Sequence, residues 1–247
     1  MRQLLVLSCL AFLLSPATVH PFQAGDRHIH LNGQSLDVTW DALTRSPQTI
    51  TAVGSDLLEV KNIAKLTKRE INDIGALLVS KYGFLLKVGP EHLILKKAEK
   101  TDGIWHVKYQ QMVRGIIVHD SSLGFSIDPE GRIRSLGAIL YPGARPPRHA
   151  KVHRKQALKA ARNRLKEAEA TEYRLQEESV AIYPERKDSA IDYRQVYIFN
   201  LFRRNGGGSV SPTGGYSVFV DAQTGKVLRT QALLMPTLSA QPKDGVQ

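Results

Sequence analysis

Residues 105–140, WHVKYQQMVRGIIVHDSSLGFSIDPEGRIRSLGAIL, predict a run of strands joined by tight turns, a β-meander. Trp105, Val107 and Tyr109 alternate with polar residues, which is typical of a strand with one buried face. Shorter apolar runs follow, and Asp128-Pro-Glu-Gly131 supplies turn chemistry, since proline fixes φ and glycine accepts positive φ. The stretch holds no nucleophile–base pair and no metal cluster, so it indicates a packing or binding surface.

Two helices are expected, one on each side of this stretch in the chain. Thr67 and Glu70 can form a capping box at the start of a helix over 64–83, which Gly83 is expected to close in the left-handed conformation. A second helix is expected over about 154–170, followed by further candidate strands. The sequence therefore predicts an α+β fold of two small domains, each one helix packed on an antiparallel β-sheet with cystatin-like layering.

The N-terminus has the pattern of an export signal. Arg2 precedes the apolar run Leu4–Leu14, and Ser15-Pro-Ala17 offers a small-residue cleavage site. We expect a signal peptide over residues 1–20 and a secreted or periplasmic protein, with no transmembrane span in the mature chain. The single cysteine, Cys9, would be removed with the signal, so stability must come from core burial.

Catalytic and metal-binding patterns are missing from the sequence. It contains no His-Glu-x-x-His run, which would place two zinc ligands on one helix face, and no Gly-x-Ser-x-Gly nucleophile motif. His28 and His30 could begin a metal site, but no further ligand is near them in sequence, so a solvated strand face is the preferred interpretation. We expect no enzymatic activity, no metal and no cofactor.

The meander carries a family resemblance. It resembles the propeptide domain of thermolysin- and fungalysin-type metalloproteases, although Gly115-Ile-Ile-Val118 stands where that family usually has Gly-Val-Pro-Val. The matching residues are His106, Val107, Tyr109, Gln110, Gln111, Gly115, Val118, Asp128 and Gly131. For Tyr109, Gln110 and Gly115, packing, cross-strand pairing and a backbone bend are the preferred roles, and contact with a partner is the alternative.

A second resemblance follows in the order found in those propeptides. Residues 216–228, YSVFVDAQTGKVL, resemble the closing hairpin of a PepSY domain, with Asp221 and Gly225 as its motif residues. The expected organisation is N-terminal strands plus a thermolysin-propeptide-like domain over 25–147, a PepSY-like domain over 148–231, and a disordered tail over 232–247. Pro146-Pro147 lies at the boundary because consecutive prolines favour an extended linker.

The net charge is +11, and its densest source runs from Arg145 to Lys166, with nine Lys or Arg residues and no acid. Such a run is either a solvated helix face or a docking surface for something acidic. Export and the lack of aromatic residues in the segment argue against nucleic acid. The candidate partner-binding residues are Tyr109, Gln110, Gln111, Gly115, Arg145, Arg148, Lys151, Arg154 and Lys155.

The resemblance implies a function by contact with another protein. Propeptides of this kind fold and inhibit their peptidase, so we expect an exported, non-catalytic module that binds a thermolysin-like metallopeptidase in trans as inhibitor or folding helper. Strand addition or insertion of residues 233–238 into the cleft would be the means. The alternative is a cell-envelope protein that docks on an anionic polymer or lipid through 145–166, and a third possibility is a fragment of a protease gene.

Overall fold

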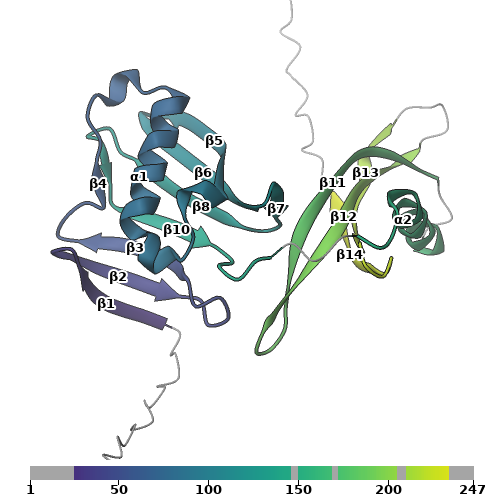
Figure 1. Ribbon diagram of the computed structural model, residues 1–247. Coiled ribbons are helices and arrows are strands. Elements are labelled where there is room, and N and C mark those ends of the chain that lie inside the picture. The colour runs from purple at the N-terminus through teal and green to yellow at the C-terminus, as the bar shows by residue number, and fades with distance from the viewer. Residues whose placement is uncertain (1–24, 146–149, 169–171, 205–209, 234–247) are drawn as a thin grey trace, which may run out of the picture.

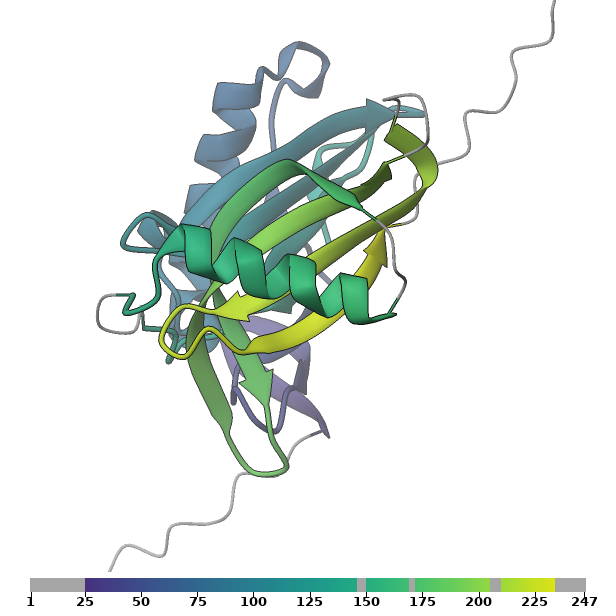
Figure 2. The same cartoon turned by 90° about the vertical axis from the view of Figure 1, so that its right-hand side faces the viewer.

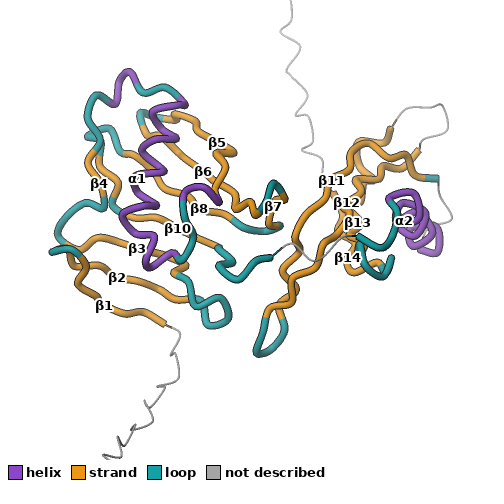
Figure 3. The backbone as a smooth tube through the Cα atoms, in the orientation of Figure 1, coloured by secondary structure: helices purple, strands orange, loops and turns teal. Residues whose placement is uncertain are grey.

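The computed structural model describes residues 25–145, 150–168, 172–204 and 210–233 (Figures 1 and 3). We call residues 25–145 the N-terminal half; it contains β1 (Gly25–Leu31), β2 (Gln34–Trp40), β3 (Pro47–Val53), β4 (Leu58–Glu59), α1 (Lys68–Leu86), β5 (Leu93–Thr101), β6 (Ile104–Val113), β7 (Ile116–Val118), β8 (Ser122–Ile127), β9 (Arg132–Ile133) and β10 (Ser135–Ile139). The C-terminal half is the rest; it contains α2 (Arg154–Ala168), β11 (Tyr173–Arg186), β12 (Ile191–Arg204), β13 (Val210–Asp221) and β14 (Val227–Leu233).

Several sequence predictions fall outside the described residues. They are the signal peptide over 1–20, the paired prolines at 146–147, Arg148, and the tail from residue 234 onward. Strand β14 extends to Leu233, past the domain boundary expected at residue 231.

The described strands form one large mixed sheet of twelve strands, besides a short β4–β9 pair. Its order is β1-β2-β3-β10-β8-β6-β7-β11-β12-β13-β14, with β5 paired to β6. All its pairings are antiparallel except that of β7 with β11, where Ile117 lies opposite Ala181 and Val118 opposite Ile182. The α+β class is therefore confirmed, but two clearly separate helix-on-antiparallel-sheet domains are not seen, because this parallel pairing joins the two sets of strands.

Each helix nevertheless covers its own part of the sheet (Figures 1 and 2). Helix α1 packs on the N-terminal strands through a core that includes Ile71, Leu78 and Tyr82. Helix α2 lies across the C-terminal strands, on their side away from the N-terminal half, and buries Ala157, Ala161 and Leu165 against residues of β12 and β13. The sequence pattern that predicted two helix-covered layers thus corresponds to two separate cores. The pairing of β7 with β11, which joins the two sets of strands, was not predictable from local patterns.

Helix α1 begins at Lys68, after the expected start at residue 64 but directly behind the expected capping box, and it ends later than expected. Thr67 caps it: its Oγ1 accepts from the amide of Glu70 at 3.3 Å, and the Glu70 carboxylate accepts from the Thr67 amide at 2.7 Å. The prediction that Gly83 closes the helix is wrong. The helix continues because Leu85 and Leu86 are buried, and Lys87 takes the left-handed position at φ +56°.

Candidate interaction surfaces

Two of the meander residues predicted as partner contacts are buried. Tyr109 is 3% exposed, and its hydroxyl donates to the carbonyl of Ile71 in α1 at 3.2 Å. The helix comes this close because Gly75 faces the ring, where an added Cβ would lie 2.0 Å from the hydroxyl oxygen. Burial, with a contribution from the charge of Asp73, raises the pKa of Tyr109 to about 12. Tyr109 therefore fixes the helix to the sheet.

Gln111 is 2% exposed and ties β6 to the chain that leaves the meander. Its Nε2 donates to the carbonyl of Tyr141, and its Oε1 accepts from the amide of Tyr141, both at 2.9 Å. Its backbone amide donates to Ser121 Oγ at 3.0 Å. Because both side-chain bonds of Gln111 go to the backbone of Tyr141, they hold the chain in place where it leaves β10.

Gln110 and Gly115 lie at the β6–β7 hairpin. Gln110 is partly buried, and its Nε2 lies 3.5 Å from the carbonyl oxygen of Val118. Arg114 and Gly115 form a two-residue loop, and both have positive φ, at +51° and +80°, as a type I′ turn requires. In this geometry Gly115 makes the predicted backbone bend, and the Gln110 side chain makes a contact across the hairpin, in keeping with its predicted cross-strand pairing. Their contact with a partner stays a prediction.

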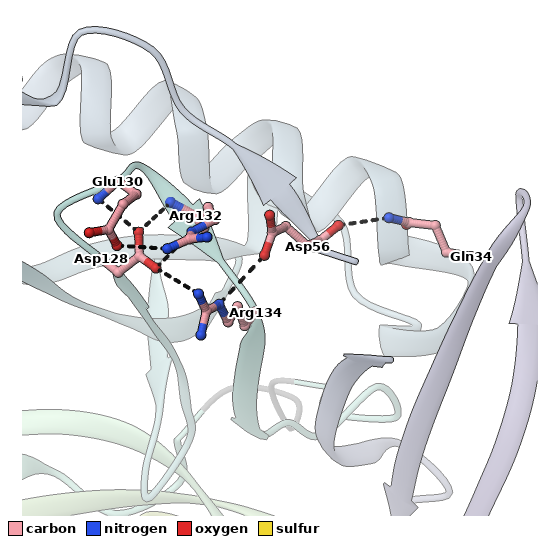
Figure 4. A network of polar contacts seen from close by, with 6 residues as sticks. All are labelled: Gln34, Asp56, Asp128, Glu130, Arg132 and Arg134. Atoms are coloured by element: carbon pink, nitrogen blue, oxygen red, sulfur yellow. Dashed lines mark hydrogen bonds and ion pairs between the residues drawn. The ribbon is translucent and has the colours of Figure 1, made fainter. Parts of the chain in front are cut away.

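The predicted turn motif at Asp128 is built around one carboxylate (Figure 4). Asp128 Oδ1 accepts from the amides of Glu130 and Arg132, at 3.1 and 2.8 Å, and Oδ2 accepts from Arg132 Nε at 3.2 Å. Although burial acts to raise it, these bonds and the positive charges of Arg132 and Arg134 lower the pKa of Asp128. Gly131 has φ +87°, and an added Cβ would lie 2.1 Å from the carbonyl oxygen of Val60.

Asp221 makes an equivalent turn in the C-terminal half. Its Oδ1 accepts from the amides of Gln223 and Thr224, at 2.7 and 3.0 Å, and its Oδ2 accepts from Arg194 at 2.9 Å. Gly225 follows with φ +74°. Both predicted Asp–Gly motifs are therefore turns in which a carboxylate caps backbone amides and is neutralised by an arginine.

A third such turn, at Asp41, was missed in the sequence. Asp41 Oδ1 accepts from the amides of Leu43 and Thr44, at 3.0 and 2.8 Å, and Oδ2 pairs with Arg186 of β11 at 2.8 Å. The available signal was the repeated pattern Asp-Ala-x-Thr, which occurs at residues 41–44 and again at 221–224. Because Arg186 belongs to the C-terminal half, this carboxylate also connects the two halves.

The junction between the halves contains aromatic and charged side chains around the β7–β11 pair. The His119 amide donates to the carbonyl of Ile182 at 2.8 Å, and its ring lies 4.8 Å from the ring of Phe219, between centroids. Burial lowers the pKa of His119; Asp120 opposes this effect and Arg229 adds to it. Val118, Tyr141, Ala144 and Ile182 form a small buried cluster beside it. The junction is therefore packed as well as hydrogen-bonded.

The sheet face opposite α1 is an open trough of about 690 Å³. Across four neighbouring strands, Lys108, Gly124, Gly137 and Thr49 lie opposite one another. The two central positions carry no side chain, so backbone is accessible at the bottom of the trough. Lys97, His106, Arg132 and Arg134 lie around it, with Glu99 and Asp128 as the acidic residues. This shape suits a partner that approaches the sheet face closely.

The basic segment is exposed but only partly free. Arg145, Lys151 and Lys155 are exposed, whereas Arg154 forms an ion pair with Glu178 of β11. The nine predicted partner-binding residues therefore do not form one patch. They are divided among the interior of the N-terminal half, the β6–β7 hairpin and the α2 segment, and Arg148 lies outside the described residues.

The described ranges hold neither a metal-binding cluster nor a membrane-spanning helix. There, no group of three or more His, Cys, Asp or Glu side chains is placed to hold a metal ion. His28 and His30 are instead bonded to Asp37 and Ser35, at 2.9 and 3.0 Å, on the exposed side of β1. Neither helix in the described ranges combines the length and apolar content needed to cross a membrane.

Comparisons with known proteins agree with the two resemblances. Residues 91–138 match the fungalysin/thermolysin propeptide motif, and residues 151–231 match the peptidase propeptide and YPEB domain, PepSY. The chain thus contains a propeptide motif followed by a PepSY domain, and no peptidase domain was found in it. No curated protein matches the chain. A similar solved structure is the Bacillus megaterium YpeB C-terminal domain, which is 15% identical with a TM-score of 0.40; the match covers 82% of this chain and 78% of that one.

Proposed function

We propose that the chain is an exported, non-catalytic module that binds a thermolysin-like metallopeptidase in trans, as an inhibitor or a folding helper. The observation that carries this proposal is the succession of the two matched regions, a metallopeptidase propeptide motif and then a PepSY domain. In this proposal the chain consists of two cystatin-like units, residues 25–147 and residues 148–231, which are joined through the β7–β11 pair.

The trough is the surface we propose for the peptidase. All the residues that line it, from Lys97 to Gly137, lie within the matched propeptide motif at 91–138. Tyr109 and Gln111, by contrast, serve the interior of the same strands. The motif therefore combines an inner face that holds α1 with an outer face that presents Gly124 and Gly137, where a partner can reach the backbone.

The end of the described chain offers a second contact with the peptidase. Strand β14 is last in the sheet order, so within the described residues one of its edges is unpaired, and Arg229 is its single charged residue. Such an edge can accept an added strand. Residues 233–238 would then enter the peptidase cleft, although of these only Leu233 is described.

The test uses the chain without its predicted signal peptide. Its inhibition of purified thermolysin-like peptidases, and its effect on the yield of active enzyme during refolding of a denatured peptidase, are measured in parallel. We expect the chain either to inhibit a peptidase or to assist its refolding. Replacing Gly137 with Trp should weaken that activity about tenfold, because the indole fills the trough at the centre of the contact.

The matched control is Gly83→Trp on α1. Both glycines have ordinary φ and room for a Cβ, with nothing near Gly83 and the nearest atom 4.0 Å away at Gly137, but Gly83 is on the helix side of the sheet. The proposal is rejected if the chain neither inhibits nor assists any thermolysin-like enzyme. If the two variants weaken binding equally, the trough is not the contact surface, although the chain still binds the peptidase.

A further inference from the structure

Helix α2 carries a single row of cations that the peptidase proposal does not use. Positions 155, 159, 162 and 166 follow one another at steps of four, three and four residues, which places them along one side of an α-helix. All four are exposed basic residues: Lys155, Lys159, Arg162 and Lys166. We call them the α2 row. At 1.5 Å per residue it extends for roughly 16 Å, with roughly 5–6 Å between successive positions.

The row is distinct from the other cations of the basic segment. Arg154 is neutralised by Glu178, whereas none of the four row residues forms an ion pair with another described residue. Unpaired like charges at i,i+4 spacing repel one another and destabilise a helix, so the row does not serve the stability of α2. A ligand with repeated negative charges would remove that repulsion.

The shape of the surface indicates which kind of anion. The apolar side of α2, with Ala157, Ala161 and Leu165, is buried against Phe199 and Val218, so it cannot enter a lipid interface as amphipathic membrane-binding helices do. The four row positions form a single line on the exposed part of α2, apart from the exposed Arg164. The helix lies on the side of the C-terminal strands away from the N-terminal half, which contains the trough (Figure 1). We infer that the α2 row binds one strand of a linear polyanion with repeating phosphate groups, leaving the trough free.

The probe is long-chain inorganic polyphosphate, titrated against the chain without its predicted signal peptide and followed by calorimetry at increasing NaCl concentration. We expect binding whose logarithm falls with the logarithm of salt with a slope of about −3, because each of four contacts to a single-stranded polyanion contributes about −0.7. Replacing the row, Lys155→Gln, Lys159→Gln, Arg162→Gln and Lys166→Gln together, should weaken binding roughly tenfold or more.

A control variant removes the same charge elsewhere. Lys61, Lys65, Lys68 and Arg69 are exposed on the N-terminal half, and their joint replacement by Gln should change affinity by less than about twofold. Equal weakening by both variants would show that net charge alone binds the polymer, and unchanged binding of the row variant would show that the row is not the site. Either result overturns the inference.

Vesicles of phosphatidylcholine with phosphatidylglycerol distinguish a polymer from a membrane. If they bind more tightly than polyphosphate and lose binding in the row variant, the partner is a lipid surface and the inference is wrong. Peptidase inhibition or assistance is measured with a variant that keeps Lys155 and carries Lys159→Gln, Arg162→Gln and Lys166→Gln. It should be unchanged, so this inference can fail without affecting the peptidase proposal.

Discussion

Gly131 occupies a position where a side chain has no room. It combines φ +87° with a Cβ position 2.1 Å from a backbone oxygen of Val60. We expect Gly131→Ala to lower the free energy of unfolding by about 2–4 kcal/mol, because both the backbone strain and the displaced Val60 segment add to the cost. Urea unfolding, followed by tryptophan fluorescence, measures it. Gly137→Ala is the control, with its nearest atom at 4.0 Å and no positive φ, and an equal loss there would contradict the prediction.

Asp41 makes the fold sensitive to acid. Although burial acts to raise its pKa, the bond from the Thr44 amide and the nearby Arg186 lower it from 3.8 to about 2. A carboxylate with a lowered pKa in the folded state stabilises the protein above about pH 4, and this stabilisation is lost as the pH falls from about 4 to 2. We therefore expect unfolding free energy to decline over that range.

Replacing Arg186 with Met tests the origin of this sensitivity. Without the guanidinium the pKa of Asp41 should rise toward its ordinary value, so the decline between pH 4 and 2 becomes shallower. At pH 7 the variant should lose about 1–3 kcal/mol, because a buried acceptor loses its charged donor. Urea unfolding at several pH values measures both effects. Arg69→Met, at an exposed site on α1, should leave both unchanged.

At the scale of elements, α1 depends on its capping box. We expect Thr67→Ala to cost about 1 kcal/mol of unfolding free energy, because the hydroxyl satisfies the Glu70 amide and positions the reciprocal carboxylate. Thermal unfolding by circular dichroism gives the difference. The control is Thr230→Ala in β14, an exposed threonine, and a similar loss in both variants would mean that the box does not stabilise the helix.

The two ends of α1 show what sequence could and could not predict. Its start was predictable because the capping box joins residues three apart. Its end was not, because Leu85 and Leu86 extend the helix by packing on strands distant in sequence. In the same way, the charge run at 145–166 was visible in the sequence. The ion pair of Arg154 with Glu178, which distinguishes Arg154 from the residues of the α2 row, was not, because it depends on the position of β11.

At the scale of the whole molecule, the β7–β11 pair is the feature that local patterns could not predict. It brings together segments far apart in the chain, and its residues Val118 and Ile182 are fully buried only because the halves meet. The predicted α+β class and both Asp–Gly turns rest on local chemistry, which explains their agreement. The trough follows from strand alternation, but its depth depends on Gly124 and Gly137 lying opposite each other.

We expect the two halves to unfold together. Both tryptophans, Trp40 and Trp105, lie in the N-terminal half, so fluorescence reports on that half while far-ultraviolet circular dichroism reports on both. Ile182→Asp should separate the two transitions, because it buries a charge in the cluster at the junction. Val180→Asp on the same strand, where the side chain is 39% exposed, should leave them coincident. Coincident transitions in the Ile182 variant would show that the halves are coupled by other contacts.

The shortness of that parallel pair also has a mechanical meaning. The long β11–β12 ladder, from Tyr173 to Arg186, would share a pulling force over many hydrogen bonds, but β7 and β11 meet over two residue pairs. Tension applied between β1 and β14 would therefore separate β7 from β11 at a lower force than it would separate the longer strand pairs on either side. The molecule would then lengthen while both helix-covered layers stay folded. The β7–β11 pair would be able to form again when the load is removed.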